Sequence, residues 1–262
     1  MSRMDFDLEI VAVPFRMQPG LRRLAAWDPQ LTRLDPASAL HREKLAVMEA
    51  GQSRHAAEGF DPSLAIAAMR ERMPSDQPPE IAYEQDFAVL DGATGTLRWL
   101  CVCVPSHWAP EEKIGLDFAA VHMPVADNKL LVGASSQLVK LATSGECWER
   151  FVWTISPSGR YDQHPKRHAR EPWPDAHDVD AFGDGCWLRW ERQTFFPVGA
   201  GTQQAVFTIR VMLQPLRDAI APAGGARKLH DSIASMSEAV LAYKGLAPAR
   251  DPLLAWLARR AG

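Results

Sequence analysis

Three segments in the second half of the chain constrain its fold more than any other feature. They cover residues 147–156, 186–196 and 204–213. Trp, Phe and Val dominate the first two, which end at turn-forming residues or Pro, and the third is similarly apolar. Such composition is typical of β-strands. We therefore expect three strands of one antiparallel sheet, covered by helices, in an α+β fold.

A β-hairpin is expected upstream of these strands. Residues 86–90 and 96–104 are apolar, and the turn-rich sequence Asp-Gly-Ala-Thr-Gly separates them at 91–95. Two short apolar runs around a Gly-containing turn predict a hairpin. Because side chains alternate along a strand, Cys101 and Cys103 should share a face with Leu97 and Trp99. There they are expected to serve as packing residues.

Helical patterns occur on both sides of this predicted sheet. One apolar stripe covers 40–48, and Asp61-Pro62 predicts the start of a helix that ends near Met73. Further helices are expected over 128–143, over 229–240, and from Asp251-Pro252 onward. We interpret 1–262 as one domain. Its expected parts are a loop-rich and helical lead (1–80), a core (83–216) and C-terminal helices (227–262).

Residues 156–185 have little periodicity and combine several Pro and His residues with many charges. We interpret this segment as a surface excursion, or a lid. His164 and His168 are four residues apart, but Pro165 lies between them and the carboxylate of a zincin motif is missing. A metal site there is therefore not expected.

Composition excludes several classes of protein. The chain has 47% hydrophobic and 23% charged residues and a formal net charge of -3, which is ordinary for a globular protein and unfavourable for nucleic-acid binding. No apolar run approaches the roughly 20 residues that span a bilayer, and acids stand where a leader peptide needs bases. The four cysteines form no C-x-x-C pair, so neither a zinc nor an iron–sulfur site is expected. A cytoplasmic protein with reduced thiols and no membrane contact fits best.

The stretch from Val104 to Val125 is the most informative about function. It places His122, a possible metal ligand, at the end of an apolar run, with Trp108, Lys113 and Gly115 shortly before it. A planar, apolar cofactor with acidic edges would need this mixture. An ordinary buried loop would need it too, so the stretch alone leaves both interpretations open.

Four blocks between about residues 83 and 216 resemble one family. They begin with Glu-Gln-Asp-Phe-Ala-Val-Leu at 84–90, then Pro-Ser-His-Trp-Ala-Pro-Glu-Glu-Lys-Ile-Gly at 105–115 with Val-His-Met-Pro-Val at 121–125. Trp-Glu-Arg-Phe-Val-Trp at 148–153 follows, and Trp-Glu-Arg-Gln-Thr-Phe at 190–195 leads into Phe-Thr-Ile-Arg at 207–210. In order and spacing, these blocks resemble the heme-binding alpha subunit of heme-dependent oxidative N-demethylases.

The resemblance implies a PAS-like antiparallel sheet that binds heme b. It also implies the use of dioxygen to remove a methyl group from a small secondary amine, with release of formaldehyde. A histidine of the family pattern matches His122, which is then expected to ligate the heme iron. A satisfied core histidine is the alternative. His107 and Trp108 belong to the same block and are expected beside the cofactor.

The resemblance also suggests roles for charged residues. Heme propionates require cationic partners where they leave a partly dry pocket. The candidates are Lys113, Arg150, Arg189, Arg192 and Arg210, and a surface salt bridge is the alternative for each. Glu191 lies in an apolar, aromatic strand and is the candidate for holding a substrate ammonium. Its alternative is a structural pair with an arginine.

Departures from the family pattern separate heme binding from catalysis. His107 stands where members often have Arg, Val152 where they often have Asn, and Ala126 where Pro is common. A heme-binding sensor or carrier without turnover is therefore the second hypothesis, and a protein that has lost heme is the third. Because no Gly-x-Gly-x-x-Gly turn or cluster-ligating cysteine motif is present, electrons should come from a separate reductase or redox subunits.

Overall fold

The structure is a computed structural model that describes residues 6–17, 20–25, 27–126 and 128–261. The first five residues, on which the expectation about a leader peptide partly depends, lie outside this range. Within it, no helix combines the length and apolar character needed to cross a membrane.

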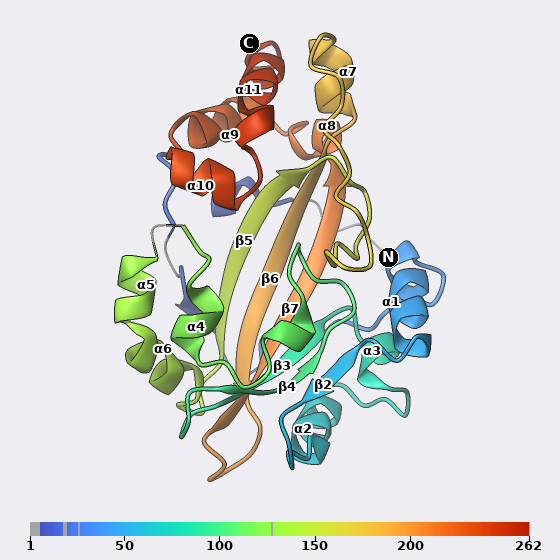
Figure 1. The fold of residues 1–262 in the computed structure, drawn as a ribbon, viewed down its shortest axis with the longest axis vertical. Helices are drawn as coiled ribbons and strands as arrows, with labels where there is room; N and C mark the ends of the chain where they lie inside the picture. The colour runs from blue at the N-terminus through green and yellow to red at the C-terminus, as the bar shows by residue number, and fades with distance from the viewer. Residues whose placement is uncertain (1–5, 18–19, 26, 127, 262) are drawn as a thin grey trace.

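A seven-stranded antiparallel sheet organises the described residues, in the order β1-β5-β6-β7-β3-β4-β2 (Figure 1). The strands are β1 (Arg22–Arg23), β2 (Arg54–Ala56), β3 (Asp86–Asp91), β4 (Leu97–Cys101), β5 (Trp148–Ser156), β6 (Trp187–Pro197) and β7 (Gln204–Pro215). The predicted α+β class, the hairpin and the three long strands are confirmed. The short edge strands β1 and β2 had no clear signal in the sequence.

The long strands form a meander that returns to the hairpin. In the ladder, Trp153 pairs with Trp190 and Trp190 with Met212. β7 then pairs with β3, where Phe87 lies opposite Thr208. The hairpin and the meander therefore form one continuous sheet, although helices separate them in the sequence.

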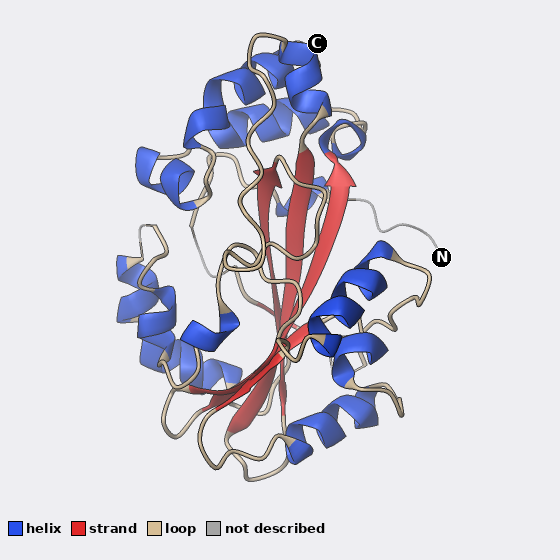
Figure 2. Cartoon of the chain, turned by 45° about the vertical axis from the view of Figure 1, so that its right-hand side comes forward, coloured by secondary structure: helices blue, strands red, loops and turns tan. Residues whose placement is uncertain are grey.

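Helices lie around this sheet in three groups (Figures 1 and 2). The first group is α1 (Ala39–Glu49), α2 (Ser63–Arg72) and α3 (Pro79–Ala82), and the second is α4 (Phe118–His122), α5 (Lys129–Gly133) and α6 (Ser135–Ala142). The third group gathers at one end of the long strands and contains α7 (Val179–Asp184), α8 (Leu216–Ala219), α9 (Gly225–Ala234), α10 (Glu238–Tyr243) and α11 (Arg250–Ala258). Single 3-10 turns occupy Leu8–Ile10, Pro110–Glu112 and Ala247–Ala249.

One face of the β5–β6–β7 meander is covered by the C-terminal helices, and we call it the closed face. Trp153, Leu188 and Trp190 point to this side and pack in one cluster with Leu229 and Trp256 from α9 and α11. Packing is tight enough to require glycine at position 183, where a Cβ atom would lie 2.1 Å from the Trp256 indole. The closed face is the main apolar core at this end of the molecule.

The opposite side of β5 and β6 is less completely covered, and we call it the open face. The ladder aligns Arg150 with Gln193 and Val152 with Glu191, so these four side chains share one side of the sheet. Arg150, Val152 and Gln193 are only partly buried. The open face therefore places a charged and partly accessible surface beside α4.

Two expected helices are each divided into two. The segment 128–143 forms α5 and α6, and 229–240 forms parts of α9 and α10. At the second break, the Ser237 side chain accepts a hydrogen bond from the Val240 N–H at 3.2 Å and caps a new helix. A side-chain cap of this kind competes with continuation of the preceding helix.

The prediction that Cys101 and Cys103 share a face with Leu97 and Trp99 is confirmed for Cys101 and Trp99 and wrong for Leu97 and Cys103. β4 ends at Cys101, and its register against β3 shifts between Val89 and Leu90. Cys101 packs with Trp99, whereas Leu97 and Cys103 belong to other clusters. One irregular position is sufficient to change the face to which a strand residue points.

The segment 156–185 is not simply a surface excursion. Asp162, Gln163 and His164 are buried, and Arg167 binds Asp162 through two nitrogens while also donating to the Cys103 carbonyl. His164 pairs with Glu111, and His168 pairs with Asp162. Hydrophilic composition concealed this network because its polar groups satisfy one another internally.

Candidate functional site

The position of His122 is fixed by local contacts at both ends of α4. The Asp117 side chain accepts a hydrogen bond from the Ala120 N–H at 2.7 Å and caps the helix start. The Asn128 side-chain amide donates to the Met123 carbonyl at 2.8 Å, just after the helix. Phe118 N–H donates to the Gly95 carbonyl, which ties α4 to the hairpin turn.

The His122 ring is held so that one nitrogen remains available. Its Nδ1 lies 2.7 Å from the Phe118 carbonyl oxygen, which can only accept, so Nδ1 carries the proton. The ring also stacks on Phe118 with 4.1 Å between centroids. Within the described residues, no hydrogen bond to Nε2 is found. A metal-ligating histidine requires this arrangement, with the second nitrogen donating to a carbonyl.

Electrostatics favour the neutral form of His122. Burial lowers its pKa, the hydrogen bond to Phe118 opposes this, and the positive charges of Arg150 and Lys113 lower it further. A neutral imidazole has the lone pair that metal coordination needs. The same interactions show that Arg150 and Lys113 lie near the His122 ring.

Arg150 and Lys113 are cations with unused donor capacity. Arg150 Nε is buried without an acceptor in the described structure. Burial lowers the pKa of Arg150, while Glu191 and Tyr243 raise it. Lys113, partly buried after the turn Pro110–Glu112, forms no side-chain hydrogen bond or ion pair with the described residues. A buried donor without a partner is unusual in a native protein, and it leaves Arg150 able to bind an acceptor that the described chain does not supply.

Glu191 is a buried carboxylate bound by neutral donors. It is 9% exposed, and its Oε1 accepts a hydrogen bond from the Ser106 hydroxyl. Its Oε2 accepts a hydrogen bond from the Gln193 amide at 2.7 Å. No Lys or Arg of the described chain forms an ion pair with Glu191. Its expected alternative, a direct pair with an arginine, is therefore not observed in this part of the chain.

The other three predicted cationic residues are engaged by protein acceptors. Arg189 is buried and donates to the Ser106 hydroxyl at 2.8 Å and to the carbonyls of Val104, Arg160 and Tyr161. Arg192 pairs with Glu149 on the closed side, and Arg210 pairs with Glu84. The structure thus brings Lys113 and Arg150 to His122, whereas Arg189, Arg192 and Arg210 fix parts of the fold.

His107 and Trp108 occupy different environments although they are adjacent. His107 is exposed, has a left-handed backbone with φ of 59°, and lines a small cavity with residues such as Gln163 and Arg170. Trp108 is partly buried and packs with Phe207 over the sheet. Trp108 can therefore form part of an apolar wall, whereas His107 faces a cavity that none of the residues around His122 lines.

Two residues of the C-terminal helices influence this site electrostatically, although the direct contacts of the Lys244 ammonium are with the Trp153 carbonyl and the Phe15 and Trp153 rings. Tyr243 and Lys244 both interact electrostatically with Glu191 and Arg150. Burial lowers the pKa of Lys244 to about 8, Glu191 opposes this, and Arg150 adds to it. From the sequence this region is expected only to form C-terminal helices, and no motif connects it to Glu191.

The combined arrangement suits a flat, anionic group with a metal centre. Arg150, Lys113 and Lys244 contribute positive charge, and Glu191 is the carboxylate with which Arg150 and Lys244 interact. Trp108, Phe118 and Phe207 supply apolar surface close to the charged groups. In the described chain, no group of three or more His, Cys, Asp or Glu residues could hold a bare metal ion. The imidazole Nε2 is better suited to a metal that arrives with its own equatorial ligands.

A comparison with known protein families also indicates a protein that binds a flat, anionic group with a metal centre. The family described as "Haem-dependent oxidative N-demethylase, alpha subunit-like" matches residues 80–254. This range covers two thirds of the chain, from α3 to α11, and includes His122, Arg150, Glu191 and Lys244.

Proposed function

The chain belongs to the heme-dependent oxidative N-demethylase alpha subunit-like family, and from this premise we propose that it is a heme-dependent oxidoreductase acting on a small secondary amine. The observation that carries the proposal is the state of His122, whose Nδ1 is bonded to the Phe118 carbonyl while its Nε2 has no hydrogen-bond partner among the described residues.

The residues around His122 fit heme b. His122 would ligate the iron through Nε2, because the hydrogen bond at Nδ1 fixes the required tautomer. Lys113 and Arg150 would pair with the two propionates, which would supply the acceptor that Arg150 Nε lacks. We therefore restrict the propionate role, proposed from sequence for five cations, to these two.

Glu191 is proposed to bind the substrate ammonium. Its neighbours Ser106 and Gln193 are neutral donors, and the chain supplies no direct ion-pair partner for the carboxylate within the described range. Heme propionates would offset the positive charges of Arg150 and Lys113, which otherwise disfavour a cationic amine. The two donors keep the Glu191 oxygens oriented.

When bound, the heme would supply the chemistry, activating dioxygen to oxidise the N-methyl carbon, with release of formaldehyde. The chain's own contribution is to ligate the heme iron, to orient the amine and to keep water out of the pocket. We also propose that the required electrons come from a separate reductase or redox subunits, consistent with the description of the family as an alpha subunit.

The fold supports a PAS-like assignment for this single proposed heme-binding domain. A hairpin, β3–β4, is followed by helices α4 to α6 and then by the three-stranded meander, whose last strand pairs with the first strand of the hairpin. This arrangement leaves a curved sheet face for a ligand, with α4 beside it.

An absorption spectrum tests the cofactor directly. The full chain, expressed with heme supply, should show a Soret band in both oxidised and reduced forms. His122→Ala should lose most of the heme, whereas His177→Ala, which removes an exposed histidine from the 156–185 segment, should retain it. Equal occupancy and an unchanged spectrum in His122→Ala would refute the ligand assignment. Absence of heme in the unaltered protein would favour a member that has lost the cofactor.

A formaldehyde assay separates an enzyme from a heme sensor or carrier. Heme-loaded protein is supplied with dioxygen, dimethylamine and an excess of a chemical reductant, which provides the two electrons that each turnover requires. The enzyme proposal expects formaldehyde well above the His122→Ala background. Heme binding with no formaldehyde above that background would support the sensor or carrier, which the departures at His107 and Val152 motivate.

A further inference from the structure

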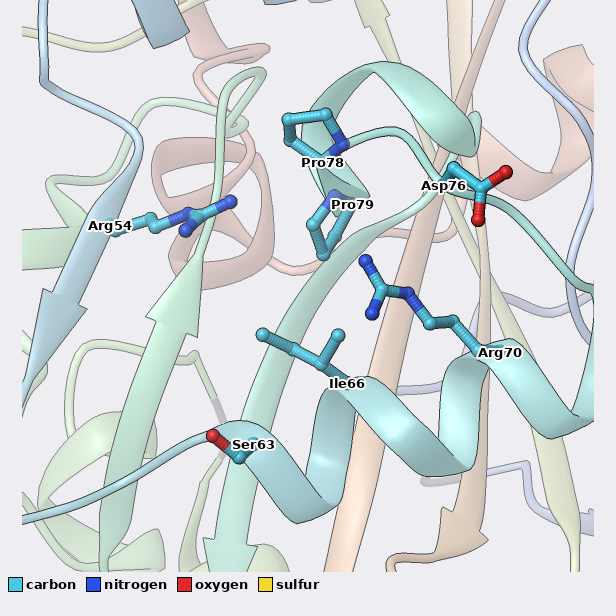
Figure 3. A pocket seen from close by; sticks show the side chains of 7 residues that line it. All are labelled: Arg54, Ser63, Ile66, Arg70, Asp76, Pro78 and Pro79. Atoms are coloured by element: carbon cyan, nitrogen blue, oxygen red, sulfur yellow. The ribbon is translucent and has the colours of Figure 1, made fainter.

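A cavity of about 340 Å³ lies between β2, α2 and the segment that leads into α3 (Figure 3). Its lining combines two arginines, one acid and one serine with three apolar side chains: Arg54, Ser63, Ile66, Arg70, Asp76, Pro78 and Pro79. None of these residues belongs to the His122 site. The volume is within the range of small-ligand pockets, so its chemistry requires a separate explanation.

Arg54 is held rigidly at one side of this cavity. Its Nε and Nη2 donate to the two carboxylate oxygens of Glu80 at 2.6 and 2.8 Å. Glu80 is 1% exposed and also accepts from the Ser53 hydroxyl. This bidentate pair fixes the plane of the guanidinium group beside the cavity. Arg54 is therefore pre-organised for a second acceptor.

Arg70 enters the cavity from the other side. Its side chain rises from α2 toward Pro79, while Arg54 extends toward the same residue from β2 (Figure 3). Arg70 forms no hydrogen bond or ion pair with the residues that the structure describes. In this view the Asp76 carboxylate lies beyond Arg70, remote from Arg54. The space between the guanidinium groups thus favours an anion.

The remaining walls indicate what kind of anion. Ile66, Pro78 and Pro79 present apolar surface, and neither proline has a backbone N–H to donate. Phosphate sites at helix starts rely on free backbone N–H groups. At the start of α2, however, both the Ser63 N–H and its hydroxyl donate to Asp61 Oδ1, at 2.9 and 2.6 Å. Two guanidinium groups can bind either anion, but the apolar surface beside them favours a carboxylate carried on an apolar body over free phosphate.

We propose that this cavity binds a carboxylate carried on an apolar body, with the carboxylate between Arg54 and Arg70 and the apolar part against Ile66, Pro78 and Pro79. Such a group could belong to a small organic acid or to the C-terminal residue of a partner protein. Both sources share the same recognition chemistry. The site is independent of heme and of the proposed demethylation.

Calorimetric titration of the full chain tests the proposal with three probes. Hexanoate combines the carboxylate with an apolar body, hexanamide lacks the charge, and inorganic phosphate lacks the apolar body. Hexanoate should bind at least tenfold more tightly than either, because a charge-assisted hydrogen bond contributes more than a neutral one. Equal binding of hexanamide or tighter binding of phosphate would overturn the proposal.

Variants locate the binding within the molecule. R70Q should weaken hexanoate binding at least tenfold. The affinity of R70K should lie between those of R70Q and the unaltered chain, since lysine keeps the charge but loses the planar guanidinium group. R227Q removes an exposed arginine from α9 and serves as the matched control with unchanged binding. Equal affinity in R70Q and R227Q, with both melting like the unaltered chain, would refute the site.

Peptides then identify the source. A short peptide ending in leucine is compared with the same peptide carrying a C-terminal amide, and both are compared with hexanoate. Tighter binding of the free-acid peptide, lost in R70Q, would indicate a partner's C-terminus. Tighter binding of hexanoate would indicate a small acid. Heme content should be the same in R70Q and in the unaltered protein, so failure here is distinguishable from failure of the proposed function.

Discussion

The closed and open faces are two sides of the same strands, but their charged side chains differ in whether they have partners of opposite charge. On the closed face, buried Glu149 is paired with both Arg22 and Arg192. On the open face, Arg150 Nε has no acceptor in the described chain, and Glu191 has only neutral donors. Charged groups on the closed face are thus paired with one another, whereas those on the open face lack charged partners in the described chain, which suits a group that the protein does not itself supply.

The largest expected difference between the faces concerns apolar truncation. Leu188 is 0% exposed on the closed face, whereas Val152 on the open face is partly exposed. Leu188→Ala should lower the free energy of unfolding by about 2–5 kcal/mol, because it leaves a cavity in packed surroundings. Val152→Ala should cost about 1 kcal/mol or less in the heme-free protein. Urea denaturation of both variants checks this, and equal losses would show that the faces are packed alike.

Charge removal should change stability in opposite directions on the two faces. Arg192→Gln leaves the buried Glu149 with Arg22 alone and should destabilise the heme-free protein by about 1–3 kcal/mol. Arg150→Gln removes a buried cation without an acceptor, so stability should be unchanged or increase by up to about 1 kcal/mol. Arg150→Gln should, however, weaken heme retention at least tenfold. A destabilised Arg150→Gln variant with normal heme content would make Arg150 a structural residue.

The smallest change in structure is expected from Glu191→Gln. The substitution keeps the side-chain shape and removes the charge, so unfolding should change by about 1 kcal/mol or less and heme content should persist. Formaldehyde production from dimethylamine should fall at least tenfold because the ammonium loses its charged partner. Glu238→Gln on exposed α10 is the matched control. Parallel loss of heme in Glu191→Gln would instead indicate a role in folding the pocket.

The sequence predicted the long strands well because their signal is local. Trp, Phe and Val concentrate in β5 and β6, and the turn before β4 is rich in glycine, so composition alone locates them. Features that depend on a single competing interaction were missed. The Ser237 cap divides a periodic helix, and the register shift at Val89 moves Leu97 to another cluster, although neither alters the apolar pattern.

The candidate site was predictable only to the extent that it lies within contiguous motifs. His122, Lys113, Arg150 and Glu191 came from recognisable blocks, and the structure brings them together. Which cations remain available was not predictable, because the acceptors of Arg189 lie in loops 28 to 85 residues away in the sequence. The approach of Lys244 to Glu191 likewise depends on the packing of α10 against the sheet, for which no local pattern exists.

Lys244 has a consequence beyond the site. Within the described residues β1 pairs with β5 only at Trp148 and Glu149, so the later part of β5 lies at an edge of the sheet. The Lys244 ammonium donates to the Trp153 carbonyl at 2.6 Å, on this stretch of strand. An unpaired strand is a template for strands of other chains, and a lysine at the edge discourages such pairing. Lys244, which interacts electrostatically with Glu191, is thus also expected to disfavour aggregation by strand pairing at the edge of β5.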